Sequence, residues 1–248
     1  MSYNEEAEIK NIVILIAMEA EGKPYIDAMH LEKVESKVPQ FPTTYYEGEF
    51  HGGKVTVVLN GKDKRYEVDN VGTTPAALSA FLAITELKPD LIINAGTAGG
   101  FRKHTAQIGD VFISSEFKFH DRRIPIPGFH EYGRGNYTSH PCPHLVNKFG
   151  YKTGVVTTSN ALDHSETDDV IMEENTAAVK DMEAASIAWV VEQFHTPFFA
   201  IKVITDIVDG ERPTNEEFLE NLHTASHSLQ ENLPKIIEYC MGKKLGEL

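Results

Sequence analysis

The chain has 248 residues, of which 41% are hydrophobic and 24% are charged. This much apolar material can bury one large core, so we expect a single domain over residues 10–248 after a flexible N-terminus, residues 1–9. The formal net charge of -14 would repel a phosphate backbone, which argues against nucleic acid as a partner and favours a small, uncharged or zwitterionic ligand.

The two cysteines, Cys142 and Cys240, have no paired spacing, so neither a disulfide framework nor a zinc site is indicated. The histidines show no metal-ligand spacing, and only His120, within FHDRR, stands out. The first ten residues are polar and acidic, unlike a signal peptide, and no apolar run approaches the roughly 20 residues of a membrane span. We therefore expect a cytoplasmic protein with no membrane partner and no metal.

Short runs rich in β-branched residues recur along the chain, and several are apolar on both faces, as in a covered sheet. They predict strands over residues 12–17, 54–59, 90–95, 110–119, 153–158 and 198–205. Between them, Thr74 and Pro75 are typical of a helix N-cap and first turn, and Pro89 ends that segment. The alternation of strands and helices indicates an α/β fold.

The C-terminal part predicts two further helices. One covers residues 182–194, and a longer amphipathic one starts at a capping box formed by Thr214 and Glu217. The longest stretch without periodicity, residues 120–143, is rich in Pro, Gly, His and Tyr, and we expect it to carry function or an interface.

The first predicted strand ends in AMEAE, which puts acidic residues where the carboxyl end of a parallel strand meets a helix. Glu21 is therefore a candidate base. The alternative is that Glu19 and Glu21 only complement the helix dipole.

The run NAGTAGG, residues 94–100, is interpreted as a glycine turn whose amides and Thr97 hydroxyl can approach a ligand closely. It lacks both the Walker lysine and the GxGxxG spacing, so a purely structural turn is the alternative.

Two more acidic residues lie at the ends of predicted elements, one at the start of a helix and one at the end of an apolar strand. Glu183 begins an apolar helix, where a carboxylate can accept hydrogen bonds from the vicinal hydroxyls of a ribose or can simply satisfy the helix dipole. Asp206 follows five largely apolar residues, and burial would raise its pKa so that it carries a proton near neutral pH. A turn aspartate that bonds local backbone is the alternative for Asp206.

Taken together, five motifs resemble, in order and spacing, those of the 5'-methylthioadenosine/S-adenosylhomocysteine nucleosidases, most of all the plant enzymes. These motifs are AMEAE, NAGTAGG, FHDRRIPIP, KDMEAASIA and ITDIVDGERPTNEEFL. The resemblance runs from residue 10 to the C-terminus. It implies the three-layer nucleoside phosphorylase-like fold, a central mixed β-sheet flanked by helices, and a homodimer.

The resemblance also implies roles. Glu21 would activate water, Asp206 would protonate adenine, and Glu183 would hold the ribose hydroxyls. Met182 would pack on the ribose, Thr97 and Ala98 would lie beside the water, and Val68 would form an apolar wall at the 5' group. The remaining substrate-binding residues are Leu162 and Asp163, through their backbone groups at the adenine edge, with Met18, Lys202 and Thr205.

Two positions depart from the wider family pattern. Lys202 stands where bacterial relatives have an arginine beside the water, so the positive charge is kept but the planar guanidinium group with its paired N–H donors is lost. Ser159 and Asn160 replace a Gly-Asp pair ahead of the adenine-contacting segment, so contacts of that aspartate side chain do not carry over.

The implied activity is hydrolysis of 5'-methylthioadenosine to adenine and 5-methylthioribose in methionine salvage, without a cofactor, with S-adenosylhomocysteine as a second candidate substrate. One alternative is a phosphorylase of the same fold, which would call for arginines near the glycine turn, where Asn94 stands. Another is a storage or binding protein that has lost catalysis, although all three acidic candidates are present.

Overall fold

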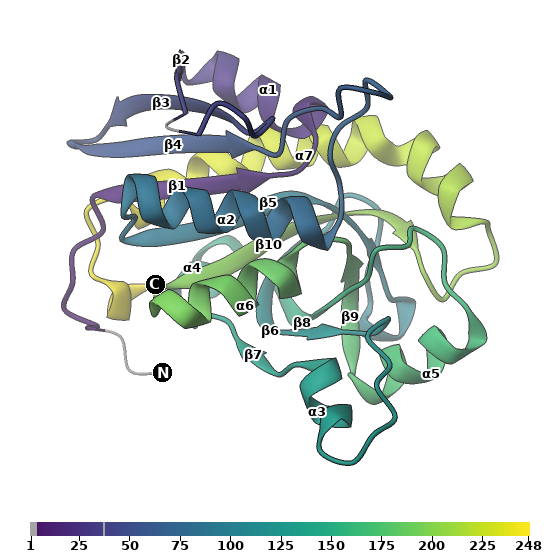
Figure 1. Cartoon of the computed structure of the whole chain (residues 1–248). Coiled ribbons are helices and arrows are strands. Elements are labelled where there is room, and N and C mark those ends of the chain that lie inside the picture. The colour runs from purple at the N-terminus through teal and green to yellow at the C-terminus, as the bar shows by residue number, and fades with distance from the viewer. Residues whose placement is uncertain (1–3, 37) are drawn as a thin grey trace.

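The computed structural model describes residues 4–36 and 38–248 (Figure 1). Within these residues, ten strands form one mixed sheet. They are β1 (Asn11–Ile16), β2 (Glu32–Val34), β3 (Thr44–Phe50), β4 (Gly53–Leu59), β5 (Leu91–Gly100), β6 (Val111–Phe119), β7 (Tyr137–Thr138), β8 (Lys152–Thr158), β9 (Ala177–Asp181) and β10 (Phe198–Ile207).

The described part of the chain has seven α-helices, of which six connect strands and the seventh follows the last strand. They are α1 (Glu19–Ala28), α2 (Thr73–Leu87), α3 (Phe129–Arg134), α4 (Pro143–Phe149), α5 (Glu166–Glu174), α6 (Ala184–Phe194) and α7 (Thr214–Cys240). No helix among the described residues is long and apolar enough to cross a bilayer.

The strands run in the order β10-β6-β8-β9-β5-β1-β4-β3-β2, and β5 also pairs with β10. Strands β5, β10, β6, β8 and β9 therefore close a circuit at one end of the sheet. Strand β1 lies parallel to both β4 and β5, whereas β10 pairs antiparallel with β6. The predicted mixed sheet is confirmed.

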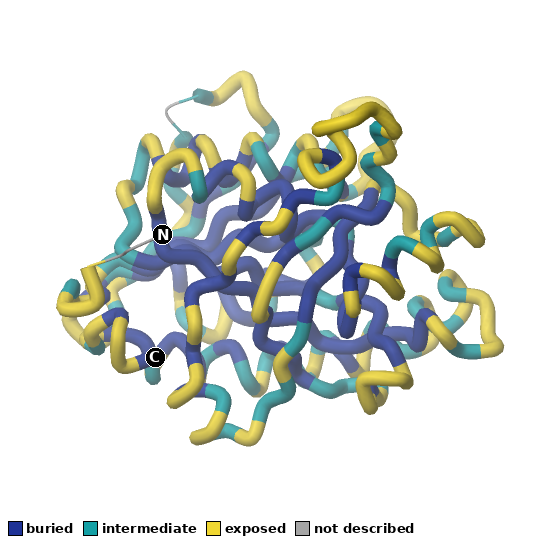
Figure 2. Tube along the Cα trace, turned by 90° about the horizontal axis from the view of Figure 1, so that it is seen from below, coloured by how far each residue is buried: buried dark blue, intermediate teal, exposed yellow. Residues whose placement is uncertain are grey.

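Helices cover both faces of this sheet. One apolar core joins β1, β4, β5 and β10 to α1 and α7, and a second joins the opposite side chains of the same strands to α2 and α6. Figure 1 shows α2 and α6 side by side on their face, and Figure 2 shows the buried residues concentrated in the central strands. The predicted three-layer α/β architecture is therefore confirmed.

The six predicted strands are all present, and most of their ends agree within two residues. The exception is β5, which continues to Gly100, so NAGTAGG is a strand and not the turn we expected. The run can remain extended because β10 pairs with it as far as Gly100. Strands β2, β3, β7 and β9 were not predicted; they are short, polar or lack a clear alternation.

Both predicted N-caps are wrong. Helix α2 begins at Thr73, and its N-cap is Gly72, which has no side chain to offer. Helix α7 begins at Thr214 itself, and the Glu217 carboxylate accepts the Ile207 backbone N–H at 2.8 Å instead of capping its own helix. Neither helix therefore has a hydrogen bond from an N-cap side chain.

The stretch 120–143 is not irregular throughout, because it contains α3 and β7. At the N-terminus, residues 1–3 of the expected flexible segment lie outside the described residues. Ile9 is fully buried and its backbone N–H donates to Lys243. The domain boundary at residue 10 stays a prediction.

Candidate active site

A cavity of ≈ 310 Å³ lies at the carboxyl ends of β1, β5, β9 and β10, beside the first turns of α6 and α7. Its volume is at the lower end of the range for pockets that bind small molecules. The walls are mostly apolar, and several buried charged groups reach into them. It is lined by Ala17, Met18, Glu21, Val71, Asn94, Ala95, Gly96, Thr97, Ala98, Gly99, Leu162, Lys180, Asp181, Met182, Glu183, Lys202, Thr205, Asp206, Thr214 and Phe218.

Glu21 lies in the first turn of α1 but turns toward β5. Its Oε1 accepts the backbone N–H and the hydroxyl of Thr97, both at 2.7 Å. The side chain is buried, and burial raises the pKa of Glu21 against the opposing effects of Thr97 and Lys202. Thr97 of β5 therefore holds the Glu21 carboxylate in place. A residue that only complemented the helix dipole would not need these two hydrogen bonds.

Glu183 precedes α6 and does not cap it. Its Oε1 instead accepts the backbone N–H of Gly72, directly before α2, at 2.9 Å. Burial is the main reason that the pKa of Glu183 is raised to about 7, with Lys202 acting in the opposite direction. The Glu183 carboxylate thus makes its hydrogen bond to Gly72 and not to the N-terminus of α6, as the helix-dipole alternative would require.

A lysine lies among these carboxyl groups. Lys202 Nζ contacts Asp181 Oδ2 at 2.8 Å, and both side chains are almost completely buried. Burial disfavours the ammonium ion, but the negative charges of Asp181 and Glu183 outweigh burial and raise the pKa of Lys202. Lys202 therefore remains a fixed cation inside the cavity wall.

Asp206 occupies the end of β10. The Thr205 hydroxyl donates to Asp206 Oδ1 at 2.7 Å and also lies 3.1 Å from the carbonyl oxygen of Ala98. Burial raises the pKa of Asp206, although Thr205 and Lys180 act to lower it. A raised pKa is what a proton donor near neutral pH requires.

The small residues of β5 make room for these carboxyl groups. A Cβ on Gly99 would lie 2.7 Å from Asp206 Oδ2 and 2.6 Å from Val208. A Cβ on Gly96 would lie 3.4 Å from both carboxylate oxygens of Glu21. The glycines of the run therefore permit close approach by side chains, and Gly99 is the more tightly constrained of the two.

Most of the residues predicted for the site line this one cavity. Besides the three acidic residues they are Met18, Thr97, Ala98, Leu162, Met182, Lys202 and Thr205. Val68 does not: it is exposed, in a segment closed by the Lys62–Asp69 bridge, and Val71 lines the cavity in its place. Asp163 lines an adjoining cavity that shares Leu162 and Thr214.

Sequence reasoning missed several lining residues. Asp181 and Lys180 lie directly before Met182 in KDMEAASIA, and Asn94 begins NAGTAGG, so the quoted motifs contained all three. Lys180 Nζ donates to the carbonyl oxygens of Ala161 and Leu162 at 3.0 and 2.7 Å. The sequence carries no signal that these residues line the cavity, because only their neighbours in the folded structure set them apart from other strand residues.

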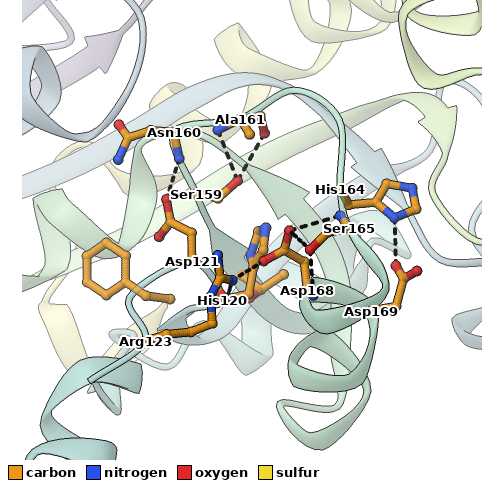
Figure 3. A network of polar contacts seen from close by, with 12 residues as sticks. His120, Asp121, Arg123, Ser159, Asn160, Ala161, His164, Ser165, Asp168 and Asp169 are labelled. Carbon is orange, nitrogen blue, oxygen red and sulfur yellow. Dashed lines mark hydrogen bonds and ion pairs between the residues drawn. The ribbon is translucent and has the colours of Figure 1, made fainter. Parts of the chain in front are cut away.

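His120 lies outside the cavity. Its Nδ1 is 3.1 Å from the Thr157 hydroxyl, and burial lowers its pKa to about 4, so it is neutral at physiological pH. Figure 3 shows it beneath the loop that carries Ser159 and Asn160. Its surroundings indicate a structural role.

The comparisons with known proteins agree with the fold. The model of the phosphorylase superfamily matches residues 11–238, and the chain therefore belongs to this superfamily.

Within the superfamily, the chain is similar to nucleosidases. It is 42% identical to the 5'-methylthioadenosine/S-adenosylhomocysteine nucleosidase of Arabidopsis thaliana over 100% of this chain and 98% of that protein. The structure of Arabidopsis thaliana 5'-methylthioadenosine nucleosidase in apo form matches with a TM-score of 0.95, at 40% identity, over 98% of this chain and 100% of that one. The Colwellia psychrerythraea nucleosidase in complex with adenine matches with a TM-score of 0.78, at 27% identity, over 95% and 97%. The resemblance to plant nucleosidases is confirmed.

Proposed function

We propose that this chain hydrolyses the N-glycosidic bond of 5'-methylthioadenosine, giving adenine and 5-methylthioribose. The observation that carries the proposal is that four buried carboxyl groups line one cavity: Asp181 is paired with Lys202, and each of the other three has one oxygen held by a neighbouring residue. Thr97 holds Oε1 of Glu21, Gly72 holds Oε1 of Glu183, and Thr205 holds Oδ1 of Asp206. We assign the second oxygen of each of these three groups to the ligand.

Adenine is a poor leaving group as an anion, so it needs a proton as the bond to the sugar breaks. Asp206, with its raised pKa, is the group to donate this proton to an imidazole nitrogen of the base. Lys180 holds the backbone of Ala161 and Leu162, the segment proposed to bind the adenine edge.

The departing base leaves positive charge on the ribose, and water must attack the anomeric carbon. Glu21 accepts the proton from this water, and Thr97 fixes the carboxylate that does so. Glu183 accepts hydrogen bonds from the ribose hydroxyls, which strengthen as the sugar becomes positive. Lys202 favours the ionised forms of Glu21 and Glu183, as both roles require.

Hydrolysis is favoured over phosphorolysis because of the charges at the cavity. No arginine is among the described residues that line it, and the buried carboxylates would repel a phosphate dianion. Lys202 is already paired with Asp181.

Product analysis tests the proposal. With 5'-methylthioadenosine in phosphate buffer made with labelled water, we expect adenine and free methylthioribose, with the label at the anomeric carbon before exchange. Methylthioribose-1-phosphate would establish the phosphorylase alternative, and no adenine release would establish the binding-protein alternative. Paired rates with S-adenosylhomocysteine decide whether that nucleoside is a second substrate.

We also propose that the chain works as a homodimer in the cytoplasm. Large apolar side chains are exposed on α2, α6 and α3, which favours their burial by a second copy; they include Leu78, Phe81, Trp189, Phe194 and Phe129. The segment 119–137 contributes Phe119 and Arg122 to a groove beside Trp189, and we propose that this segment lies near the interface and the partner's 5' site. Light scattering that gives a fully active monomer at micromolar concentration would contradict the dimer, and cell fractionation tests the compartment.

A further inference from the structure

The N-terminus of α2 contributes to the cavity but has no cap of its own. Its N-cap residue, Gly72, lacks a side chain, and no hydrogen bond from a local side chain replaces it. The first backbone N–H groups of a helix need acceptors. Here the acceptors come from two distant segments: Glu183 Oε1 takes the N–H of Gly72, and Asn160 Oδ1 takes the N–H of Thr73, each at 2.9 Å.

Asn160 is itself fixed on both sides. Its Oδ1 also accepts the Thr73 hydroxyl at 2.9 Å, and its backbone N–H donates to Asp121 Oδ2 at 2.8 Å. Figure 3 shows Asp121 reaching up to the backbone of Asn160. The side chain of Asn160 therefore joins the loop after β8 to the first residue of α2.

The backbone of Gly72 is specialised for this arrangement. Its φ of +99° is a conformation that residues with a Cβ rarely adopt. A Cβ there would also lie 2.9 Å from Asn160 Oδ1. The glycine thus lets Asn160 approach α2 closely, and the same residue presents its N–H to the carboxylate of Glu183.

From these contacts we infer that Asn160 is a positioning residue for Glu183: it caps α2 from outside and so fixes the Gly72 N–H that orients the ribose-binding carboxylate. The inference rests on the proposed role of Glu183. It also gives a reason for the amide at this position. Asn160 supplies the same acceptor oxygen as an aspartate, but adds no charge beside a cavity that already holds Glu21, Asp181 and Glu183.

The test compares ligands with and without a ribose. Formycin A is a C-nucleoside that carries the ribose and resists cleavage, whereas adenine carries no sugar. In Asn160→Ala, we expect formycin A affinity to fall roughly fivefold, which is the affinity ratio that corresponds to the free energy of one helix cap, while adenine affinity stays unchanged. The KM for 5'-methylthioadenosine should rise accordingly. Thermal melting shows whether each variant is folded.

Three further variants sharpen the result. Asn160→Asp keeps an acceptor oxygen and should restore most of the formycin A affinity. Thr73→Val removes only the hydroxyl bond and should lose less than Asn160→Ala, which keeps the test available should the alanine variant fail to fold. Asn147→Ala removes an exposed amide from α4 and is the matched control, with no effect on either ligand.

A double-mutant cycle shows whether Asn160 affects ribose binding through Glu183. If Asn160 acts through Glu183, the effect of Asn160→Ala on formycin A should shrink to about twofold or less in a Glu183→Gln background. An undiminished effect there, an equal loss of adenine binding, or no effect of Asn160→Ala would overturn the inference. If Glu183→Gln alone leaves formycin A binding unchanged, the ribose role of Glu183 fails instead.

Discussion

Three of the carboxyl groups that line the cavity, those of Glu21, Glu183 and Asp206, are all buried but differ in their neighbours. Lys202 opposes the rise in pKa at Glu21 and Glu183, and Lys180 does so at Asp206. Asp206 is additionally affected by the negative charge of Glu217, which favours its protonated form. One kind of side chain can thus serve as base, ribose acceptor and acid because the surroundings differ.

The proposed acid gives the sharpest mutational test. Asp206→Asn should leave the fold intact but reduce adenine release by at least about a hundredfold, because an amide cannot donate the required proton. Steady-state rates with 5'-methylthioadenosine measure this, and circular dichroism checks the fold. A variant that keeps more than about a tenth of the wild-type activity would move the acid role to another residue.

The pH dependence of kcat/KM should be bell-shaped. Glu21 must be ionised to accept a proton, so activity falls as the pH drops through its raised pKa. Glu183, with a pKa of about 7, adds to this acid limb because its carboxylate is the better acceptor for ribose hydroxyls. Asp206 must be protonated, so activity falls as the pH rises through its own raised pKa.

Rates measured across the pH range in buffers of constant ionic strength test this profile. In Glu183→Gln, the acid limb should become simpler because one ionising group is gone. An acid limb that is absent from the wild type would contradict the base role of Glu21.

At the scale of elements, β5 determines how closely the side chains of Glu21 and Asp206 can approach its backbone. It carries Thr97, which binds Glu21, and it lies parallel to β10, whose end bears Asp206. An uninterrupted strand of small residues gives fixed backbone amides and leaves space above them. The site therefore depends on the absence of a side chain at Gly96 and Gly99 as well as on the presence of Thr97.

Substituting the two glycines of β5 distinguishes these effects. Gly99→Ala places a methyl group 2.7 Å from Asp206 Oδ2 and should lower kcat by about tenfold or more through displacement of the acid. Gly96→Ala, at 3.4 Å from the Glu21 oxygens, should be much milder. Kinetics and melting temperatures of both variants provide the measurement. Equal losses of activity in the two variants would contradict a specific displacement of Asp206 by the methyl group of Gly99→Ala.

At the scale of the whole molecule, the two ends of the described chain meet. Ile9 and Leu245 are buried, and the Leu245 backbone N–H donates to Ala7 at 3.0 Å. The carbonyl of the last residue, Leu248, accepts the N–H of Leu145 at 2.7 Å. The C-terminal residues thus pack in the core next to Leu145 of α4, and none of residues 245–248 lines the cavity.

Deleting residues 245–248 should therefore destabilise the protein without changing the chemistry. Two buried leucines are lost, which reduces the free energy of unfolding by roughly 3–6 kcal/mol. Urea denaturation measures the change, and Glu238→Ala, an exposed position on α7, is the control with a change below about 0.5 kcal/mol. A deletion variant as stable as the wild type would show that these leucines contribute little.

Much of the fold could be predicted from local pattern. The apolar, β-branched runs predicted six strands, and the spacing of apolar residues predicted α2, α6 and α7, because burial of a regular face leaves a periodic signal. Strands β2, β7 and β9, which are short, and β3, which is largely polar, leave no such signal. They form because neighbouring strands offer free backbone groups, as when β9 pairs with both β5 and β8.

The same division applies to the site. The sequence by itself determined which chemical groups are available: acidic residues at the ends of predicted elements, a run of small residues, and motifs shared with nucleosidases. Only the tertiary structure decided what each group contacts. Glu183 bonds Gly72 from 111 residues away, Asn160 caps α2, and Asp181 pairs with Lys202. Local sequence cannot encode these partners, because a buried polar group is satisfied by whichever donor the packed chain brings within about 3 Å.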